Sequence, residues 1–368
     1  MHGKLFALLV ALSIILVASM PGCAPGGADS GTDGGGGDSS APEYTWRFGY
    51  PESMTTRNDS LQLFTHLIEA YTDGRIDVEY YGNGVLGSHS EIFDAVQAGD
   101  VEMGCFAPYV DIVPGGMLNW MPWTVSNFRQ AAVAYDPNGG IIFDVMTEAW
   151  HEVGFKLLWS APQGAYGIAN TVRPLTKPED FDGWKFRVSG SLGFVKTMEN
   201  MGSGTSLQLE TIPWSDLYQA LQTGVVDGCW NIWPSLVQER HYEVIDYYTP
   251  LNFGWDTNNV VMNEQLYDSL PADLQDAIHW ASLKAEEQNY EAIQRAVLPS
   301  IQAVEDAGVE IYWITDEERA AFREAANMSA IWDELCKPWL DEHYPGQNMT
   351  QIIQDELDRI IAETPSVV

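Results

Sequence analysis

The 368-residue sequence is poor in basic residues: it has 18 Lys and Arg against 52 Asp and Glu, a formal net charge of −34. This imbalance excludes nucleic acid and anionic lipid surfaces as partners, because they repel a chain of the same sign. Two explanations for the excess acid remain open. It provides solubility in any setting, or it reflects a saline habitat, where a Debye length of about 3 Å screens the self-repulsion.

The sequence also has only four cysteines, Cys23, Cys105, Cys229 and Cys336. The last three are odd in number and lie in apolar strand or helix contexts, which excludes a small fold built on disulfides. Cys105 and Cys229 occupy near-equivalent places in a repeat described below. A bridge between them stays open as an alternative, but we expect each to be a small buried hydrophobic residue.

Motifs of metal and nucleophilic catalysis are missing as well. The seven histidines are scattered without H-E-x-x-H or Cys/His ligand spacing, and there is no G-x-S-x-G. We therefore expect no metal and no cofactor, and nothing in the sequence demands an enzyme. Hydrolysis by a carboxylate pair stays open, because so many acids supply many possible pairs.

One motif raises the question of a cofactor, since residues 82–87 read G-N-G-V-L-G and match G-x-G-x-x-G. In a dinucleotide fingerprint the helix opens within the glycines and presents its amides to the pyrophosphate. Here Ser88 and Glu91 predict a capping box that starts the helix after the glycines. We interpret the motif as a tight turn, with a dinucleotide site as the alternative.

The longest apolar run lies at the N-terminus, from Leu5 to Ala18. It is too short to span a bilayer and is typical of the apolar region of a secretory signal. A glycine and Cys23 follow it as in the lipobox of bacterial lipoproteins, so we expect a signal peptide over 1–23 and a lipid on Cys23. Residues 24–43 predict a flexible Gly/Ser/Asp linker. The protein would be exported and held at the membrane only through this lipid.

Two segments 125 positions apart resemble each other: residues 90–102 read SEIFDAVQAGDVE and residues 215–227 read SDLYQALQTGVVD. Each predicts a helix, a glycine stop and a buried strand. The repeat therefore predicts two similar α/β lobes with a ligand cleft where the carboxyl ends of their strands face each other. Chance similarity between two amphipathic helices is the alternative.

The order of the expected elements supports an α/β fold in two lobes. Residues 45–106 predict β-α-β-α-β, and the chain is too long for one core. A helical pattern over 272–298, about 40 Å long, is long enough to lie across both lobes. Pro299 should kink or end it, and a further helix is expected over about 316–340. We expect lobe I to comprise 44–164 with about 251–292, and lobe II 165–250 with about 293–368.

Arg187 is the candidate anchor for a ligand. It lies near the end of an expected strand over 184–188, just before a helix whose amino end offers free amides and a positive dipole. A guanidinium group binds a carboxylate in a bidentate fork. Beside the expected cleft, Arg187 therefore predicts a carboxylate site, with an ordinary surface salt bridge as the alternative.

Aromatic residues gather at the ends of the two repeat strands: Tyr109 follows the first, and Trp230 and Trp233 follow the second. Core packing is the ordinary role of such residues. However, a side chain just beyond the carboxyl end of a strand lies where α/β crevices hold ligands. Asn231 is the polar residue there, and its amide both donates and accepts hydrogen bonds.

From about Tyr44 to about Leu340, the sequence resembles the solute-binding receptors of TRAP transporters, the DctP-like family. The resemblance is carried by D-G-R-I at 73–76, Y-G-N-G-V-L-G at 81–87, P-E-D-F-D-G-W-K-F-R at 178–187 and L-Y-Q-A-L-Q-T-G-V-V-D-G at 217–228. It implies a two-lobed, periplasmic-binding-protein-like (type II) fold that closes on an organic acid and delivers it to a membrane permease. An ABC-type solute-binding protein and a secreted lipoprotein hydrolase with a carboxylate pair are the alternatives.

The resemblance also implies roles for single residues. Arg187 falls on the carboxylate-clamping arginine of the family, and Asn231 on the asparagine that follows its V-D-G motif. Many relatives carry a second arginine after the glycine at position 164, where this chain has none and Gln163 is the polar neighbour. This departure argues against sialic acid or a simple C4-dicarboxylate. The aromatic residues suit a monocarboxylate with an apolar or larger body, such as a 2-oxo or aromatic acid: Tyr109, Trp123, Trp230 and Trp255.

Overall fold

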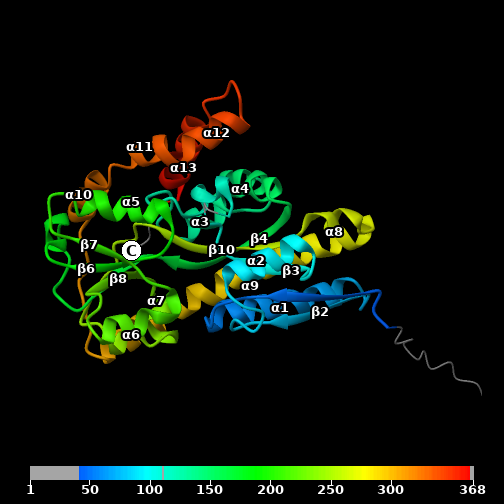
Figure 1. The fold of residues 1–368 in the computed structure, drawn as a ribbon, viewed down its shortest axis with the longest axis horizontal. Helices are drawn as coiled ribbons and strands as arrows, with labels where there is room; N and C mark the ends of the chain where they lie inside the picture. Colours follow the sequence, from blue (N-terminus) through cyan, green and yellow to red (C-terminus); the bar gives the residue numbers. More distant parts are fainter. Residues whose placement is uncertain (1–40, 110–111, 365–368) are drawn as a thin grey trace, which may run out of the picture. The chain divides into compact units, whose positions relative to one another are not determined.

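A computed structural model describes residues 41–109 and 112–364 (Figure 1). These residues form two β-sheets with helices packed on them, so the predicted α/β class is confirmed. The expected signal peptide, the lipid site at Cys23 and most of the expected linker lie outside the described residues.

The first sheet has the strand order β2-β1-β3-β10-β4. Its strands are β1 (Tyr44–Gly49), β2 (Ile76–Tyr81), β3 (Met103–Phe106), β4 (Phe155–Ala165) and β10 (Trp255–Asn263). The second sheet has the order β11-β9-β5-β8-β6-β7. Its strands are β5 (Gly167–Asn170), β6 (Lys185–Val188), β7 (Gln208–Thr211), β8 (Gly228–Asn231), β9 (Tyr247–Thr249) and β11 (Glu310–Ile311).

The helices that follow the strands are mostly amphipathic. Those before the long helix are α1 (Thr55–Tyr71), α2 (His89–Ala98), α3 (Phe128–Ala134), α4 (Ile141–Glu152), α5 (Leu192–Met201), α6 (Leu217–Gln222), α7 (Trp233–Gln238) and α8 (Glu264–Ser269). The later ones are α9 (Ala272–Asp306), α10 (Asp316–Ala326), α11 (Met328–Ile331), α12 (Lys337–His343) and α13 (Met349–Glu363). None of the helices in the described part of the chain is both long and apolar enough to cross a membrane.

The sequence repeat corresponds to a structural repeat. Helix α2 ends at Gly99 and helix α6 ends just before Gly224, and both glycines take a left-handed conformation with φ of 79° and 70°. The strand that follows, β3 or β8, pairs parallel with one neighbour (β1 or β6) and antiparallel with the other (β10 or β5). Five strands of each sheet therefore follow the same order, β2-β1-β3-β10-β4 and β7-β6-β8-β5-β9, and the prediction of two similar α/β units is confirmed.

The G-x-G-x-x-G segment is a turn that precedes its helix. Ser88 is the N-cap of α2: its hydroxyl accepts from the Glu91 amide, and the Glu91 carboxylate accepts from the Ser88 amide in return. This is the predicted capping box, which satisfies two amides that the first helical turn leaves unpaired. Because α2 begins after the glycines, its amino end is already capped by its own side chains.

Two strand connections join the sheets. Strand β4 of the first sheet passes into β5 of the second with only Tyr166 between them, and residues 250–254 return the chain from β9 to β10. The Tyr166 amide donates to the Gly254 carbonyl at 2.8 Å, and the Phe253 amide donates to the Tyr166 carbonyl at 3.2 Å. The two connections therefore run side by side, bonded to each other.

Helix α9 contacts α1 and β4 of the first unit and α7 of the second, as the length of its pattern predicted. Of the two alternatives for Pro299, a kink or an end, the end is wrong, because the helix continues to Asp306. Val304 beyond the proline is fully buried among the apolar residues of α6 and β8, and this burial holds the last turns helical. The expected helix over 316–340 is interrupted at Asn327, which has a positive φ of 48°, and by a π-helical turn at Trp332–Cys336.

The remaining cysteines are part of the apolar interior. Cys105, Cys229 and Cys336 are buried and unbridged. Burial raises the pKa of each thiol well above its ordinary value, which keeps it protonated and uncharged. The expectation that they are small buried residues is confirmed.

Candidate functional site

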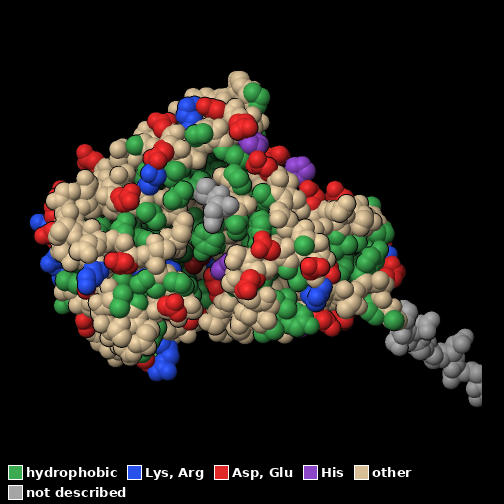
Figure 2. All heavy atoms as spheres, in the orientation of Figure 1, with side chains coloured by type: hydrophobic (Ala, Val, Ile, Leu, Met, Phe, Trp, Pro, Cys, Tyr) green, Lys and Arg blue, Asp and Glu red, His purple; other side chains and the backbone are tan. Residues whose placement is uncertain are grey.

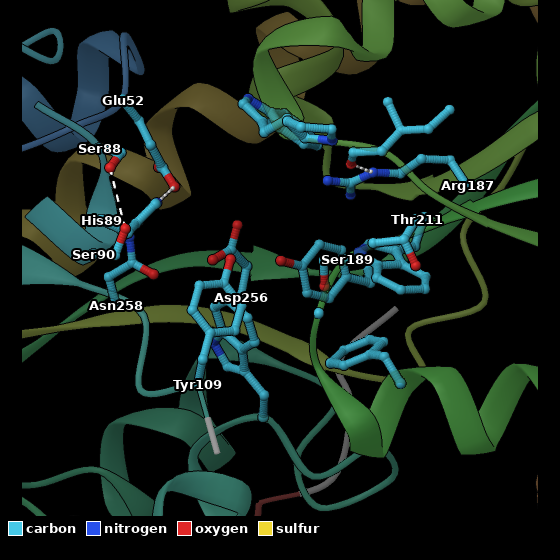
Figure 3. A pocket seen from close by; sticks show the side chains of 18 of the residues that line it. Glu52, Ser88, His89, Ser90, Tyr109, Arg187, Ser189, Thr211, Asp256 and Asn258 are labelled. Atoms are coloured by element: carbon cyan, nitrogen blue, oxygen red, sulfur yellow. Dashed lines mark hydrogen bonds and ion pairs between the residues drawn. The ribbon is translucent and has the colours of Figure 1, made fainter. Parts of the chain in front are cut away.

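A cavity of about 430 Å³ receives side chains from both sheets. Figure 2 shows a hollow with hydrophobic side chains in the middle of the face in view. Six aromatic side chains form much of its wall: Tyr109, Trp120, Tyr166, Phe194, Trp214 and Trp230. Its other charged or ionisable members are Arg187 on one side, Glu52 and His89 on the other, and Asp256 between them (Figure 3).

Arg187 comes from strand β6, where it is only 3% exposed. Its Nε donates to the Ile212 carbonyl at 2.8 Å, and its guanidinium carbon lies 5.5 Å from the Trp214 ring and 5.9 Å from the Trp230 ring. Within the described residues it forms no ion pair. Burial lowers its pKa from the ordinary value of 12.5. A buried cation without an acidic partner is costly, and an anionic ligand would supply the missing charge.

The backbone next to Arg187 adds donors to the same wall. Ser189 and Gly190 border the cavity and lead to Ser191, the N-cap of α5. No side chain caps the first turn of this ten-residue helix. Free amides and the helix dipole favour negative charge at this end. The Arg187 wall is therefore suited to a carboxylate.

The opposite wall begins just beyond strand β1. One Glu52 carboxylate oxygen accepts from Tyr50 Oη at 2.7 Å and from Arg57 at 3.0 Å, and the other contacts His89 Nε2 at 3.1 Å. Arg57 from α1 also donates to Asp256 of β10 at 3.1 Å. Arg57 is 1% exposed and lies behind the two carboxylates, which themselves border the cavity.

The two carboxyl groups respond differently to this environment. For Glu52, burial by itself raises the pKa, but the His89 hydrogen bond and the Arg57 charge outweigh it and bring the pKa to about 2. For Asp256, burial dominates and raises the pKa above its ordinary value, although the Arg57 charge opposes the change. Both effects follow from the balance between desolvation and a neighbouring cation.

Of the predicted site residues, Arg187, Tyr109 and Trp230 line the cavity. Asn231 does not: its amide nitrogen contacts His241 Nδ1 at 2.9 Å and its oxygen accepts from the Ile232 amide. Because neighbouring side chains of a strand point to opposite faces, Trp230 and Asn231 do not share the cavity. Asn231 is therefore not part of the cavity lining, and its predicted contact with the ligand stays a prediction.

Gln163 and Trp255 also lie outside the lining. Gln163 is fully buried and accepts from Thr56 Oγ1 at 2.9 Å, while its amide nitrogen has no partner among the described residues. Trp255 is 1% exposed and packs edge-on against Phe128 at 5.0 Å. It is the strand neighbour of Asp256, so the alternation that turns the acid into the cavity turns the indole into the core. Trp123 packs on Phe253 and is likewise absent from the lining.

Several lining residues were not among the sequence predictions, notably Glu52, His89, Trp214 and Asp256. Glu52 follows the end of β1, so the strand-end rule that singled out Tyr109 also applies to it. Asp256 opens a polar run, D-T-N-N, inside a buried strand, which was a usable signal because buried polar groups need partners. Trp214 is placed by a loop contact with Arg187 that no local pattern encodes.

The described residues hold no group of three or more His, Cys, Asp or Glu side chains that could bind a metal ion. What the cavity offers is a buried cation on one side, two carboxylates bridged by an arginine on the other, and aromatic rings between. It has the size and the mixed apolar and polar lining of a site for a small molecule.

Comparison with known proteins gives concordant matches. Residues 49–337 match the DctP family, described as bacterial extracellular solute-binding protein, family 7. The C4-dicarboxylate-binding periplasmic protein DctP of Rhodobacter capsulatus is 29% identical over 289 residues, covering 77% of this chain and 83% of that protein. The ectoine/5-hydroxyectoine-binding periplasmic protein UehA of Ruegeria pomeroyi is 28% identical over 293 residues, covering 78% and 84%.

A solved structure agrees with these matches. The TRAP periplasmic solute-binding protein of Chromohalobacter salexigens, crystallised with bound D-glucuronate, superposes with a TM-score of 0.74 at 26% identity. The match covers 84% of this chain and 99% of that one. The two-sheet arrangement is therefore shared over nearly the whole length of that protein.

Proposed function

We propose, from the premise that this chain belongs to family 7 of the bacterial extracellular solute-binding proteins, that Arg187 anchors the carboxylate of a small organic acid in the cavity. The single observation that carries this assignment is the buried guanidinium of Arg187, which has no acidic partner in the described chain and points into the cavity (Figure 3). A bound carboxylate would accept from its two terminal nitrogens, because Nε is the one guanidinium nitrogen that donates to a group in the described part of the chain.

The chain is a TRAP-type solute-binding receptor, as the resemblance implied, and its place is periplasmic. Such receptors work with membrane permease subunits. The ligands named for the relatives, a C4-dicarboxylate, ectoine and D-glucuronate, share a carboxylate group. This shared group supports a carboxylate for the present chain, while the rest of each molecule differs.

Further assignments extend this proposal. Signal cleavage before Cys23, a lipid on that residue and the linker over 24–43 would hold the receptor at the membrane. Residues 44–164 with 251–292 would move as one lobe, and 165–250 with 293–368 as the other. The two strand connections and α9, which join the sheets, support closure about these segments.

The cavity is proposed to bind its ligand without catalysing a reaction. Glu52 and Asp256 are the paired acids of the cavity, and both are tied to Arg57. For Glu52 this engagement helps to hold the pKa far below its ordinary value, and a carboxyl group that stays ionised is a poor general acid. Saturable binding of a carboxylate without turnover is expected. Turnover of an ester or oligosaccharide that is lost in Glu52→Gln would instead favour the hydrolase alternative.

The experiment begins with a thermal-shift screen of carboxylic acids, since a ligand that binds the folded state raises the melting temperature. Calorimetry then compares the wild type with Arg187→Ala. A charge-assisted hydrogen bond contributes about 1.5 to 3 kcal/mol, so the variant should bind at least about tenfold more weakly. Arg295→Ala, an exposed arginine on α9 paired with Glu291, is the matched control. Equal affinity in wild type and Arg187→Ala would remove Arg187 from the site.

A further inference from the structure

The wall opposite Arg187 carries two carboxyl groups that share one arginine. Glu52 and Asp256 both contact the guanidinium of Arg57, at 3.0 and 3.1 Å. No other ion pair within the described chain links either of them to a lysine or arginine.

His89 contacts the same wall. Its Nδ1 faces the Ala107 amide, which donates to it at 3.5 Å, and its Nε2 contacts Glu52 at 3.1 Å. Because Arg57 bonds the other Glu52 oxygen, the two contacts together fix the orientation of the Glu52 carboxylate.

The carboxyl groups face the cavity and the arginine that they share does not. Glu52 and Asp256 both line it, whereas Arg57 is 1% exposed behind them and is not part of the lining. In Figure 3, Glu52 and His89 lie on one side of the space and Arg187 on the other, with Asp256 between them. The cavity thus has a guanidinium on one side and carboxyl groups both in the middle and on the far side.

Aromatic rings flank the carboxylate end. Tyr109 meets the His89 ring edge-on at 5.9 Å and the Trp120 ring at 5.5 Å, and the Tyr166 hydroxyl bonds Asp256. All three rings line the cavity. Aromatic faces attract alkylated or delocalised cations, which need few hydrogen bonds and lose little hydration on burial.

On the basis of the proposed function, we propose that the ligand is a zwitterion. Its carboxylate would bind Arg187, and a quaternary or charge-delocalised cationic group would lie against Glu52 and Asp256 among Tyr109, Trp120 and Tyr166. The same arrangement disfavours a dicarboxylate, because its second carboxylate would face two acids in a desolvated site.

The test uses matched probes in the wild-type protein. The first series is ω-trimethylammonio carboxylates of increasing chain length, beginning with glycine betaine. The second is the tert-butyl carboxylates of equal length, beginning with 3,3-dimethylbutyrate, which have the same shape without the positive charge. The third is dicarboxylates of equal length. Calorimetry measures all three under the same conditions.

The expected result is that at least one zwitterion binds about tenfold or more tightly than its tert-butyl counterpart, and more tightly than the dicarboxylates. Equal or tighter binding of the tert-butyl carboxylates or the dicarboxylates would overturn the zwitterion assignment. If that binding still requires Arg187, the proposed carboxylate receptor stands without it. Failure of every zwitterion in the series to bind would also overturn the assignment.

A variant assigns the preference to the carboxylate end. Glu52→Gln keeps the side-chain shape and removes the charge, so the ratio of zwitterion to tert-butyl affinity should fall about tenfold, with the tert-butyl probe still binding. That probe also reports whether the variant is folded. Asp256→Asn provides a second variant, and Glu317→Gln, exposed on α10, makes the same change of charge away from the cavity. An unchanged ratio in both cavity variants would contradict the proposal.

Discussion

The guanidinium carbon of Arg187 lies 5.5 Å from the centroid of the Trp214 ring, and Arg187 Nε is bonded to the carbonyl of Ile212, two residues earlier in the same loop. One short segment therefore orients Arg187 by two contacts of different kinds. Because these contacts use Nε and one face of the guanidinium plane, the terminal nitrogens remain for a ligand.

The geometry of Arg187 predicts that charge alone will not preserve binding. Arg187→Lys keeps a cation but loses the planar fork, the Nε bond and the stacking on Trp214. We expect affinity for a carboxylate to fall about tenfold, close to the loss in Arg187→Ala. Calorimetry measures both variants, and a lysine variant that binds like the wild type would show that a point charge is sufficient.

His241 predicts a dependence of stability on pH. Burial, followed by the Arg187 charge, lowers its pKa from 6.5 to about 4. Between these values the unfolded state binds more protons, so stability is complete above pH 6.5 and falls as the pH is lowered toward 4. The loss attributable to this group is about 3 kcal/mol. The free energy of unfolding, measured in urea at several pH values across this range, should depend less on pH in His241→Gln than in the wild type. His66→Gln, at an exposed site, should retain the wild-type dependence on pH.

Asp256 predicts that binding of a zwitterion depends on pH. Burial raises its pKa in the free protein, and only the ionised form attracts a cation. Affinity for a trimethylammonio carboxylate should therefore fall as the pH is lowered through this raised pKa, while the tert-butyl probe changes less. Calorimetry in buffers of different ionisation enthalpy would detect the accompanying proton release. Identical pH profiles for both probes would contradict this prediction.

Glu286 of α9 predicts a stabilising substitution. It is 6% exposed, one of its oxygens has no partner in the described chain, and burial raises its pKa well above 4.5. Above pH 4.5 this group therefore binds fewer protons in the unfolded protein than in the folded one, and the free energy of unfolding declines as the pH rises toward the folded-state pKa. Glu286→Gln should increase the free energy of unfolding near pH 8 by about 1 to 3 kcal/mol. Glu287→Gln, on the exposed side of the helix, should have little effect.

The net charge of −34 predicts stabilisation by salt. Raising the ionic strength from about 0.01 to about 1 M shortens the Debye length from about 30 to about 3 Å and screens the repulsion among surface carboxylates. The melting temperature should rise over this range. Sucrose at equal osmolality controls for general exclusion from the protein surface, and an equal rise in sucrose would show that screening is not the cause.

The sequence was sufficient to predict the architecture, because the relevant signals are local. The glycines at 99 and 224 end helices of similar pattern, and the strands that follow them occupy equivalent positions in the two sheets. The strand-end rule identified Tyr109 and Trp230 on these two strands and Arg187 on the expected strand over 184–188, and all three line the cavity. In these cases position along a strand was enough to place the side chain.

The direction of a side chain could not be predicted from its closeness in sequence to other site residues. Asn231 and Trp255 were expected beside residues that do face the cavity, but strand alternation turns each of them the other way. The acidic end depends on Arg57, a helical residue that joins Glu52 to Asp256 across about 200 positions of sequence. No periodic pattern reveals such a contact, and only the fold brings the three together.

Tyr166 is the one residue between β4 and β5, and it also borders the cavity. Under the proposed closure of two lobes, backbone torsions at this residue and at its bonded partners in 250–254 would absorb part of any change in the angle between the sheets. A ligand that touches the Tyr166 ring would thus contact the residue about which the lobes close. A molecule too bulky beside Tyr166 would then be rejected because it prevents full closure.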